Sequence, residues 1–308
     1  MNQEKPKAVI VYHRVDYDGI FSGLLAGLGL TEKFKKSGIS RKLYGFNYGD
    51  ELDYELLDSA DLLILTDISF PADDMIKYKD KMLWIDHHVT AINESGQAGY
   101  EDIPGIREVG ISAAELTWQF FFPKYICPLI IKFIGAYDVW NHDSMPWEDT
   151  MAVQLGLRSR YGMSVTDVKT DLKKLLTLGP SNFSESEVYK TGKIIYEYKK
   201  QADEVKAKSF SFPVTIGGKW KGIAILNTEF GSSVFDSIPD KSLIYVVANV
   251  RGDKGISISM YTDPKEGPVD FSCGEYMKKN YSGGGHKGAA GGKLEMKEFI
   301  RLIEKREV

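Results

Sequence analysis

Short apolar runs alternate with helix-periodic stretches over the first half of the chain. Residues 8–12 (AVIVY), 62–66 (LLILT) and 82–85 (MLWI) are uninterrupted runs of aliphatic and aromatic side chains, which is typical of strands buried on both faces. Helices are expected between and after these runs, at residues 20–36, 50–59, 112–122 and 128–137. This alternation predicts βαβ units and a parallel sheet.

The second half of the chain changes from helical to hairpin periodicity. Residues 149–209 carry no strand signal, and the charged stretch at 188–208 has the spacing of a long helix. After Phe210, paired apolar runs flank Gly217-Gly218 and Gly252-Asp253, which predicts two hairpins. We therefore expect an α/β protein with a Rossmann-like parallel-sheet domain at 1–185, a helical linker at 186–209 and a smaller mixed-sheet α/β domain at 210–308.

Composition narrows the class of protein. The chain has 308 residues, of which 43% are hydrophobic and 27% charged, values typical of a globular protein with two domains. No apolar run approaches the roughly 20 residues that a membrane helix requires. The charged N-terminus precedes an apolar stretch too short for a signal peptide. We expect a cytoplasmic protein without a membrane partner.

Cysteine content and charge exclude two further classes. Cys127 and Cys273 are the only cysteines, which excludes a disulfide framework and a zinc knuckle. The net charge of −4 argues against a long duplex as partner, because such binding depends on neutralising many phosphates. A short nucleic acid or a small phosphorylated ligand remains compatible with this charge.

Polar residues cluster directly after the three expected strands. The first strand is followed by His13, Asp16 and Asp18, the second by Asp67, and the third by Asp86, His87 and His88. The carboxyl ends of parallel strands meet at one edge of a sheet, where ligands bind. We expect these side chains to converge there.

Converging carboxylates and imidazoles favour divalent cations. Without cations, mutual repulsion would protonate some of the carboxylates. The absence of thiolates from the set favours Mn²⁺ or Mg²⁺ over structural zinc. A single Asp after a strand is more often a turn or helix cap, but seven such residues after three strands favour a metal site.

The order of these motifs resembles that of the DHH phosphoesterases, which are named for the triplet found here as Asp86-His87-His88. The first motif spans His13 to Gly19, with Asp16 and Asp18 inside it, and the second is Asp67 in LTDIS. The third is IDHHVTA, the fourth is Asp138 in AYDVWNHD, and GGGHKGAAGG at 283–292 is similar to the glycine-rich signature of the DHH-associated domain.

The resemblance implies a two-metal site, with manganese as the expected ion and Mg²⁺ or Co²⁺ as alternatives. One ion would be held by His13, Asp16 and Asp67, and the other by Asp18, Asp67, His87 and Asp138. Asp143 is a competing candidate for the last position. In the family, a hydroxide bridging the two metals attacks phosphorus in line. His88 would face the phosphate, and Asp86 would hold a neighbouring imidazole.

The second domain is expected to bind substrate. Gly283, Gly284 and Gly285 would let the backbone approach a phosphate closely, and the resemblance implies nucleotide contact for this loop and His286. Arg251, after an expected strand, could pair with a phosphate in bidentate fashion or be a solvated hairpin charge.

Several functions are compatible with these residues. The leading hypothesis is a Mn²⁺-dependent phosphodiesterase or exonuclease that trims very short oligonucleotides, similar to the oligoribonucleases (nanoRNases) of the family. A phosphatase of 3′-phosphoadenosine 5′-phosphate and a cyclic or linear dinucleotide phosphodiesterase are alternatives within the same chemistry. A non-catalytic nucleotide or phosphate sensor is the alternative from another class, and the connector helix could support a homodimer.

Overall fold

The computed structural model describes residues 5–35, 38–226, 232–252, 255–263, 265–285, 287–305 and 308. The chain divides into two compact units, Met1–Tyr196 and Glu197–Val308. The boundary lies inside one long helix, α9 (Glu187–Phe210), which occupies the segment expected as a linker. The proposed domain limits at 185 and 210 remain a prediction.

The first unit contains a four-stranded parallel sheet in the order β2-β1-β3-β4. The three expected strands are present as β1 (Lys7–His13), β3 (Leu62–Thr66) and β4 (Met82–Ile85). The fourth strand, β2 (Ser40–Phe46), lies at the edge of the sheet and is not predicted from the sequence. Its first three residues are exposed, so it lacks the continuous apolar run that marks the other three.

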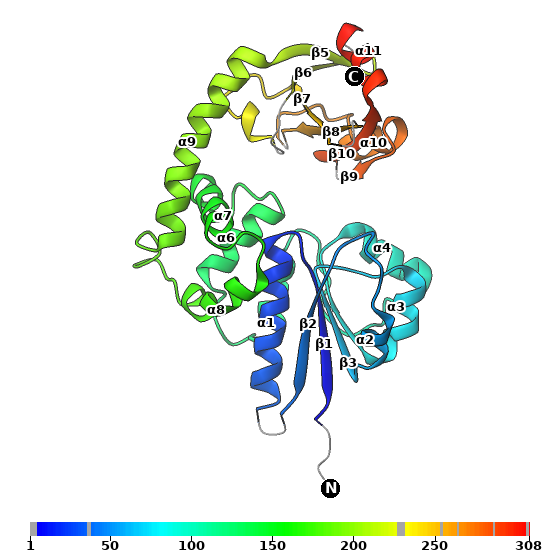
Figure 1. Cartoon of the computed structure of the whole chain (residues 1–308), viewed down its shortest axis with the longest axis vertical. Helices are drawn as coiled ribbons and strands as arrows, with labels where there is room; N and C mark the ends of the chain where they lie inside the picture. The colour runs from blue at the N-terminus through cyan, green and yellow to red at the C-terminus, as the bar shows by residue number, and fades with distance from the viewer. Residues whose placement is uncertain are drawn as a thin grey trace. The chain divides into compact units, whose positions relative to one another are not determined.

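Helices cover both faces of this sheet (Figure 1). One face packs against α1 (Tyr17–Lys33), α5 (Ala113–Phe121) and α6 (Leu129–Asp138), and the other against α2 (Tyr54–Asp58), α3 (Ala72–Tyr78) and α4 (Val89–Ala98). Ser112 caps α5 and accepts a hydrogen bond from the Glu115 amide. The expected helix at 20–36 begins three residues earlier, because Asp16 caps α1 through the Gly19 amide. A short 3-10 helix, η1 (Lys79–Lys81), precedes β4.

A helical layer follows the sheet along the chain. It consists of α7 (Trp147–Tyr161), α8 (Val165–Leu176) and the first part of α9, and, as expected, no strand occurs between residues 149 and 209. Buried side chains of α7 and α8 join the core beneath α1 and α6. The helix α7 therefore lies beside the carboxyl ends of α6 and β1, which matters for the site described below.

The second unit is a mixed six-stranded sheet in the order β5-β6-β7-β8-β10-β9. Both expected hairpins are present as antiparallel pairs: β5 (Phe212–Ile216) with β6 (Trp220–Leu226), and β7 (Ile244–Val250) with β8 (Gly255–Thr262). The short strand β9 (Gly284–Gly285) pairs with β10 (Ala289–Glu295).

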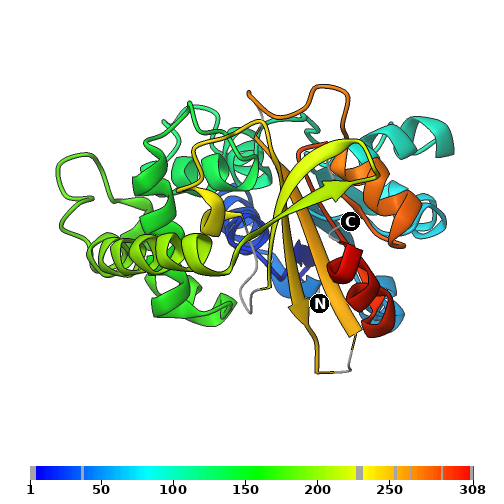
Figure 2. The same ribbon diagram turned by 90° about the horizontal axis from the view of Figure 1, so that it is seen from above.

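Helices α10 (Cys273–Asn280) and α11 (Met296–Lys305) pack on one face of this second sheet and share its core (Figure 2, orange and red). The 3-10 helix η2 (Ser233–Phe235) packs on the other face. The two units together give the α/β fold with one parallel and one mixed sheet that the sequence predicts. Among the described residues, no helix combines the length and apolar character that a membrane span requires.

Candidate metal centre

The residues that follow the strands of the first sheet converge as topology predicts. His13 ends β1, Asp67 follows β3, and His87 follows β4, while Asp138 is the last residue of α6. Three overlapping groups have ligand atoms within 4.8 Å of one another: His13, Asp16 and Asp67; Asp18, His87 and Asp138; and Asp67, His87 and His88. The structure thus brings together all six residues expected to bind metal.

Asp67 lies between the first two groups. Its Oδ2 is 3.5 Å from His13 Nδ1, and its Oδ1 is 3.1 Å from His87 Nε2. On the far sides, His13 Nδ1 is 2.7 Å from Asp16 Oδ2, and His87 Nε2 is 3.2 Å from Asp138 Oδ2. One carboxylate therefore faces both imidazoles, an arrangement suited to bridging two cations.

Asp67 adopts a backbone conformation that few residues other than glycine accept. Its φ is +61°, in the left-handed region, and its amide donates to the Ile85 carbonyl at 3.0 Å. Such strain costs of the order of 1 kcal/mol and is concentrated at functional sites. The conformation directs the Asp67 side chain into the group of imidazoles.

The buried carboxylates of the cluster require positive charge nearby if they are to stay ionised. Burial, reinforced by Asp18, raises the pKa of Asp67 well above its usual range, and the same two effects raise the pKa of Asp138. Burial opposes protonation of His13, yet Asp16 and Asp67 raise the pKa of its imidazole to about 11. Divalent cations would hold these carboxylates ionised and displace the imidazole protons.

Buried atoms without a hydrogen bond are a second indication that the cluster binds divalent cations. Among the described residues, His13 Nδ1 and Asp67 Oδ2 are buried atoms whose only close neighbours are other members of the cluster, and neither makes a regular hydrogen bond. Buried polar atoms are rarely left in this state unless an ion or a water serves them. All the donor atoms are nitrogen or oxygen, as hard and borderline cations prefer.

Asp86 positions its neighbours rather than joining a group. Its Oδ1 accepts from His88 Nδ1 at 2.8 Å and from the His87 amide at 2.7 Å, while Trp84 Nε1 donates to Oδ2 at 3.1 Å. The imidazole interaction expected for Asp86 is therefore present, with His88 as the partner. Trp84, which the sequence analysis assigned to the core, is buried and also orients this carboxylate.

Two features of the site have no signal in the sequence motifs. The Asn47 Oδ1 atom lies 3.0 Å from His13 Nε2, so it selects the tautomer that leaves Nδ1 facing Asp16. Both oxygens of Asp18 accept amide hydrogen bonds at the start of α5, from Ala113 at 2.7 Å and Ala114 at 2.9 Å. Asp18 therefore anchors α5 as well as belonging to the His87 group.

The competing ligand Asp143 lies elsewhere. Its amide donates to Asn141 in a turn, it is exposed, and it belongs to none of the three groups. The neighbouring His142 stacks on Trp147 with ring centroids 3.7 Å apart. The geometry favours Asp138 over Asp143 for the fourth motif.

The residues expected to bind substrate belong to the second unit. Gly283 and Gly285 pack tightly against β10, where a Cβ on Gly283 would lie 2.0 Å from the Gly291 carbonyl oxygen, while Gly284 is open. Arg251 follows β7, and its amide donates to the Gly255 carbonyl across the hairpin. His286 lies outside the described residues. Substrate contact by these positions stays a prediction.

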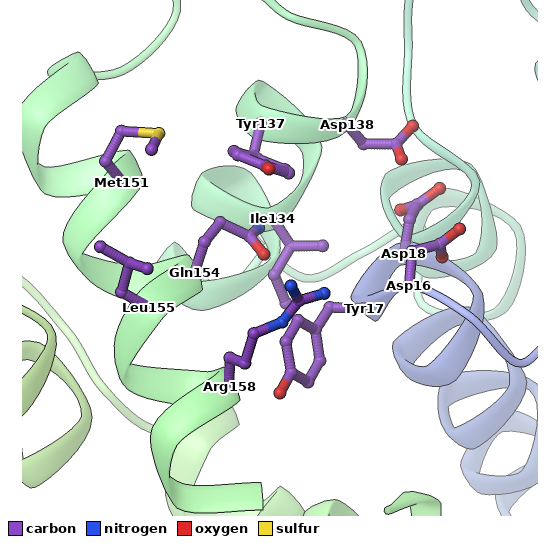
Figure 3. Close-up of a pocket in the computed structure, with 10 residues that line it drawn as sticks. All are labelled: Asp16, Tyr17, Asp18, Ile134, Tyr137, Asp138, Met151, Gln154, Leu155 and Arg158. Atoms are coloured by element: carbon purple, nitrogen blue, oxygen red, sulfur yellow. The ribbon is translucent and has the colours of Figure 1, made fainter. Parts of the chain in front are cut away.

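A pocket of about 100 Å³ adjoins the metal-site carboxylates. Figure 3 shows Asp16, Asp18 and Asp138 on one side of it and α7 on the other. The full lining consists of Asp16, Tyr17, Asp18, Ile134, Tyr137, Asp138, Met151, Gln154, Leu155 and Arg158. All of these residues belong to the first unit.

Three solved structures with a similar fold cover nearly the whole chain. A pGpG-specific phosphodiesterase from Vibrio cholerae has 15% identity and a TM-score of 0.55, with 97% of each chain covered. The DHH domain of a member of a ribosomal protein family has 12% identity and a TM-score of 0.64, with 98% of this chain and 85% of that chain covered. An exopolyphosphatase-related protein from Bacteroides fragilis has 17% identity and a TM-score of 0.51, with 98% and 91% covered.

At these identities the similarity concerns the fold. The sequence matches no protein-family model and no curated protein. The side chains of this chain must therefore carry any argument about its chemistry.

Proposed function

This chain has the fold of the DHH-domain proteins, and from that premise we propose that it is a metal-dependent phosphodiesterase acting on short oligonucleotides. The position of Asp67 between His13 and His87 carries the proposal, because one carboxylate facing two imidazole groups suits two adjacent cations. Paired cations are the usual means by which proteins cleave phosphate esters in line.

The proposed ligand sets follow the observed groups. His13, Asp16 and Asp67 would hold one cation, and Asp18, Asp67, His87 and Asp138 the other. Mn²⁺ is the proposed ion, because mixed imidazole and carboxylate ligands suit it. Such ions would supply a water-derived nucleophile at neutral pH and neutralise the developing charge on phosphorus.

His88 and Asp86 have a separate proposed role. Burial opposes protonation of His88, but its hydrogen bond to Asp86 raises the pKa of this imidazole. Because Nδ1 is occupied by Asp86, Nε2 is the nitrogen available to a phosphate oxygen or a leaving group. We assign His88 to substrate charge or proton donation and Asp86 to its orientation.

The substrate class is proposed from charge and size. The net charge of −4 disfavours a long nucleic acid, whose binding requires many cationic contacts. Gly283, Gly284, Gly285, His286 and Arg251 are proposed to contact the nucleotide. The similarity to a pGpG-specific phosphodiesterase keeps linear dinucleotides among the candidate substrates. A phosphatase of 3′-phosphoadenosine 5′-phosphate remains the second candidate, since the same cations would act on a monoester.

The test is hydrolysis of a matched panel with Mn²⁺ and with a chelator. The panel contains end-labelled RNA and DNA of several lengths, 3′-phosphoadenosine 5′-phosphate, a cyclic dinucleotide and pyrophosphate. Mn²⁺-dependent turnover that is fastest on the shortest oligonucleotides would support the proposal. Tight Mn²⁺ binding with no turnover of any member would replace it with a nucleotide or phosphate sensor.

A further inference from the structure

The pocket beside the metal centre has two chemically different walls. Asp16, Asp18 and Asp138 form an acidic wall, and Arg158 and Gln154 project from α7 on the opposite side (Figure 3). Gln154 and Arg158 are four residues apart in one helix, so their side chains share a face. Figure 3 shows the guanidinium of Arg158 directed into the pocket, beside the ring of Tyr17.

Arg158 is the single cationic side chain in the lining of this pocket. It forms no side-chain hydrogen bond or ion pair with another residue in the part of the chain that the structure describes. Arg160, two residues further along α7, instead donates to Asp171 at 3.1 Å and to the Tyr161 hydroxyl at 3.0 Å. Arg158 is exposed, so the donors of its guanidinium are open to solvent and to a ligand in the pocket.

The other side chains of the pocket limit what that ligand can be. Ile134, Met151 and Leu155 are apolar, and the hydroxyl of Tyr17 already donates to the Gly162 carbonyl. Arg158 and Gln154 are thus the donors on the α7 wall. The cavity volume of about 100 Å³ is well above the roughly 10–15 Å³ that one water requires, so the pocket has room for a phosphate group.

We propose that Arg158, assisted by Gln154, binds a second phosphate of the substrate, the one next to the phosphate that is cleaved. The inference rests on the proposed function, in which cations on the acidic wall hold the reacting phosphate. A guanidinium matches a phosphate with two parallel hydrogen bonds. The enzyme consequently prefers oligonucleotides that carry a terminal phosphate, and Arg158 is a specificity-determining residue.

The experiment compares dinucleotides that differ only in a terminal phosphate. Wild type, Arg158→Ala, Arg158→Lys and the control Arg160→Ala are assayed with Mn²⁺ on pApA, ApAp, ApA and bis(p-nitrophenyl) phosphate. For the preferred phosphorylated dinucleotide, Arg158→Ala should lower kcat/KM roughly 10- to 100-fold, mainly through KM. Turnover of ApA and bis(p-nitrophenyl) phosphate should stay unchanged, Arg158→Lys should recover part of the loss, and Arg160→Ala should behave as wild type.

A binding measurement makes the test independent of turnover. In calorimetry with Mn²⁺ present, wild type should bind 3′-phosphoadenosine 5′-phosphate, which can place one phosphate on the cations and the other at Arg158, more tightly than adenosine monophosphate, and Arg158→Ala should lose that difference. Gln154→Glu provides a second variant in case Arg158→Ala does not fold, because a carboxylate beside Arg158 should repel the phosphate and weaken the same binding.

Three results would overturn the proposal. Equal losses on ApA and on its phosphorylated forms would place Arg158 at the reacting phosphate or in folding. No loss on any substrate would remove it from the site. Equal affinity of wild type for the bisphosphate and the monophosphate would exclude a second phosphate site. If wild type hydrolyses nothing yet discriminates the two ligands through Arg158, the proposed function fails and this inference stands as a phosphate-binding site.

Discussion

The carboxamide oxygen of Asn47 lies 3.0 Å from Nε2 of His13, on the side of the imidazole opposite Asp16 and Asp67. Nε2 therefore donates its proton to Asn47, and Nδ1 is the nitrogen that faces the carboxylates and would bind a cation once its own proton is displaced. Outer hydrogen bonds of this kind fix the orientation of imidazole ligands and increase their basicity. The loop after β2 thus takes part in the site although it supplies none of the proposed ligands.

Removal of this hydrogen bond should weaken metal binding selectively. We expect Asn47→Ala to lower Mn²⁺ affinity about 10- to 100-fold, because His13 can then rotate and change tautomer. Titration calorimetry measures the affinity directly, and added Mn²⁺ should restore most of the hydrolytic activity. Asn47→Asp, which keeps the acceptor oxygen, should stay close to wild type. An unchanged affinity in the alanine variant would show that Asn47 does not orient the imidazole.

Replacing Asp67 should lower the activity and raise the stability of the metal-free protein. We expect Asp67→Asn to lower kcat by at least about 1000-fold, because both proposed cations lose a shared ligand. In the presence of a chelator, the free energy of unfolding of the same variant should exceed that of wild type, because Asn cannot ionise among the buried carboxylates and tolerates the left-handed backbone.

Steady-state hydrolysis measures the loss of kcat, and thermal unfolding with and without Mn²⁺ measures the change in stability. Mn²⁺ should raise the Tm of wild type and have little effect on the variant. Undiminished Mn²⁺-dependent hydrolysis by Asp67→Asn would contradict the two-metal assignment.

His286 should influence substrate binding more than chemistry. We expect His286→Ala to raise KM for short oligonucleotides with a smaller change in kcat, because the glycine-rich segment is assigned to nucleotide contact. Steady-state kinetics on one dinucleotide measures the two constants. Comparable KM values for the variant and wild type would remove His286 from the substrate site.

The ion pair between α7 and α8 should make stability fall in acid. Hydrogen bonds from Tyr161 and Arg160 lower the pKa of Asp171. A carboxyl group with a lowered folded-state pKa stabilises the protein above its unfolded pKa of about 4, and this contribution is lost as the pH falls through the lower folded value.

Unfolding in urea at pH 7 and at pH 3 tests that sign. Asp171→Asn should destabilise the protein at pH 7 and lose less stability than wild type on going to pH 3. Arg160→Ala should show a smaller effect in the same direction. A larger acid loss in Asp171→Asn than in wild type would contradict the assignment.

Most of the sheet and most of the proposed site residues could be predicted from the sequence for one physical reason. Strands β1, β3 and β4 are buried on both faces and read as continuous apolar runs, so the polar residues just after them stand out. Parallel topology then brings His13, Asp67 and His87 together without knowledge of their contacts. Asp138 was placed by motif resemblance alone, since a position at a helix end has no strand to mark it.

The parts that were missed depend on tertiary contacts. Strand β2 begins with exposed residues, so it lacks a continuous apolar run in the sequence. The role of Asn47, which follows β2, could therefore not be predicted. The amide hydrogen bonds that Asp18 accepts join positions 95 and 96 residues apart. Arg158 reaches the pocket only because α7 packs beside α6 and α1. Contacts of this kind, between residues far apart in the chain, produce no hydrophobic periodicity that could be recognised in the sequence.

The same exposed residues that conceal β2 have a consequence for self-association. Among the described residues, β2 is an edge strand, and its outer backbone groups form an edge to which a strand from another molecule could add. Arg41 and Lys42 lie on this edge, so two copies joined through it would set like charges against each other. Continuation of the sheet from one molecule into the next is thereby opposed.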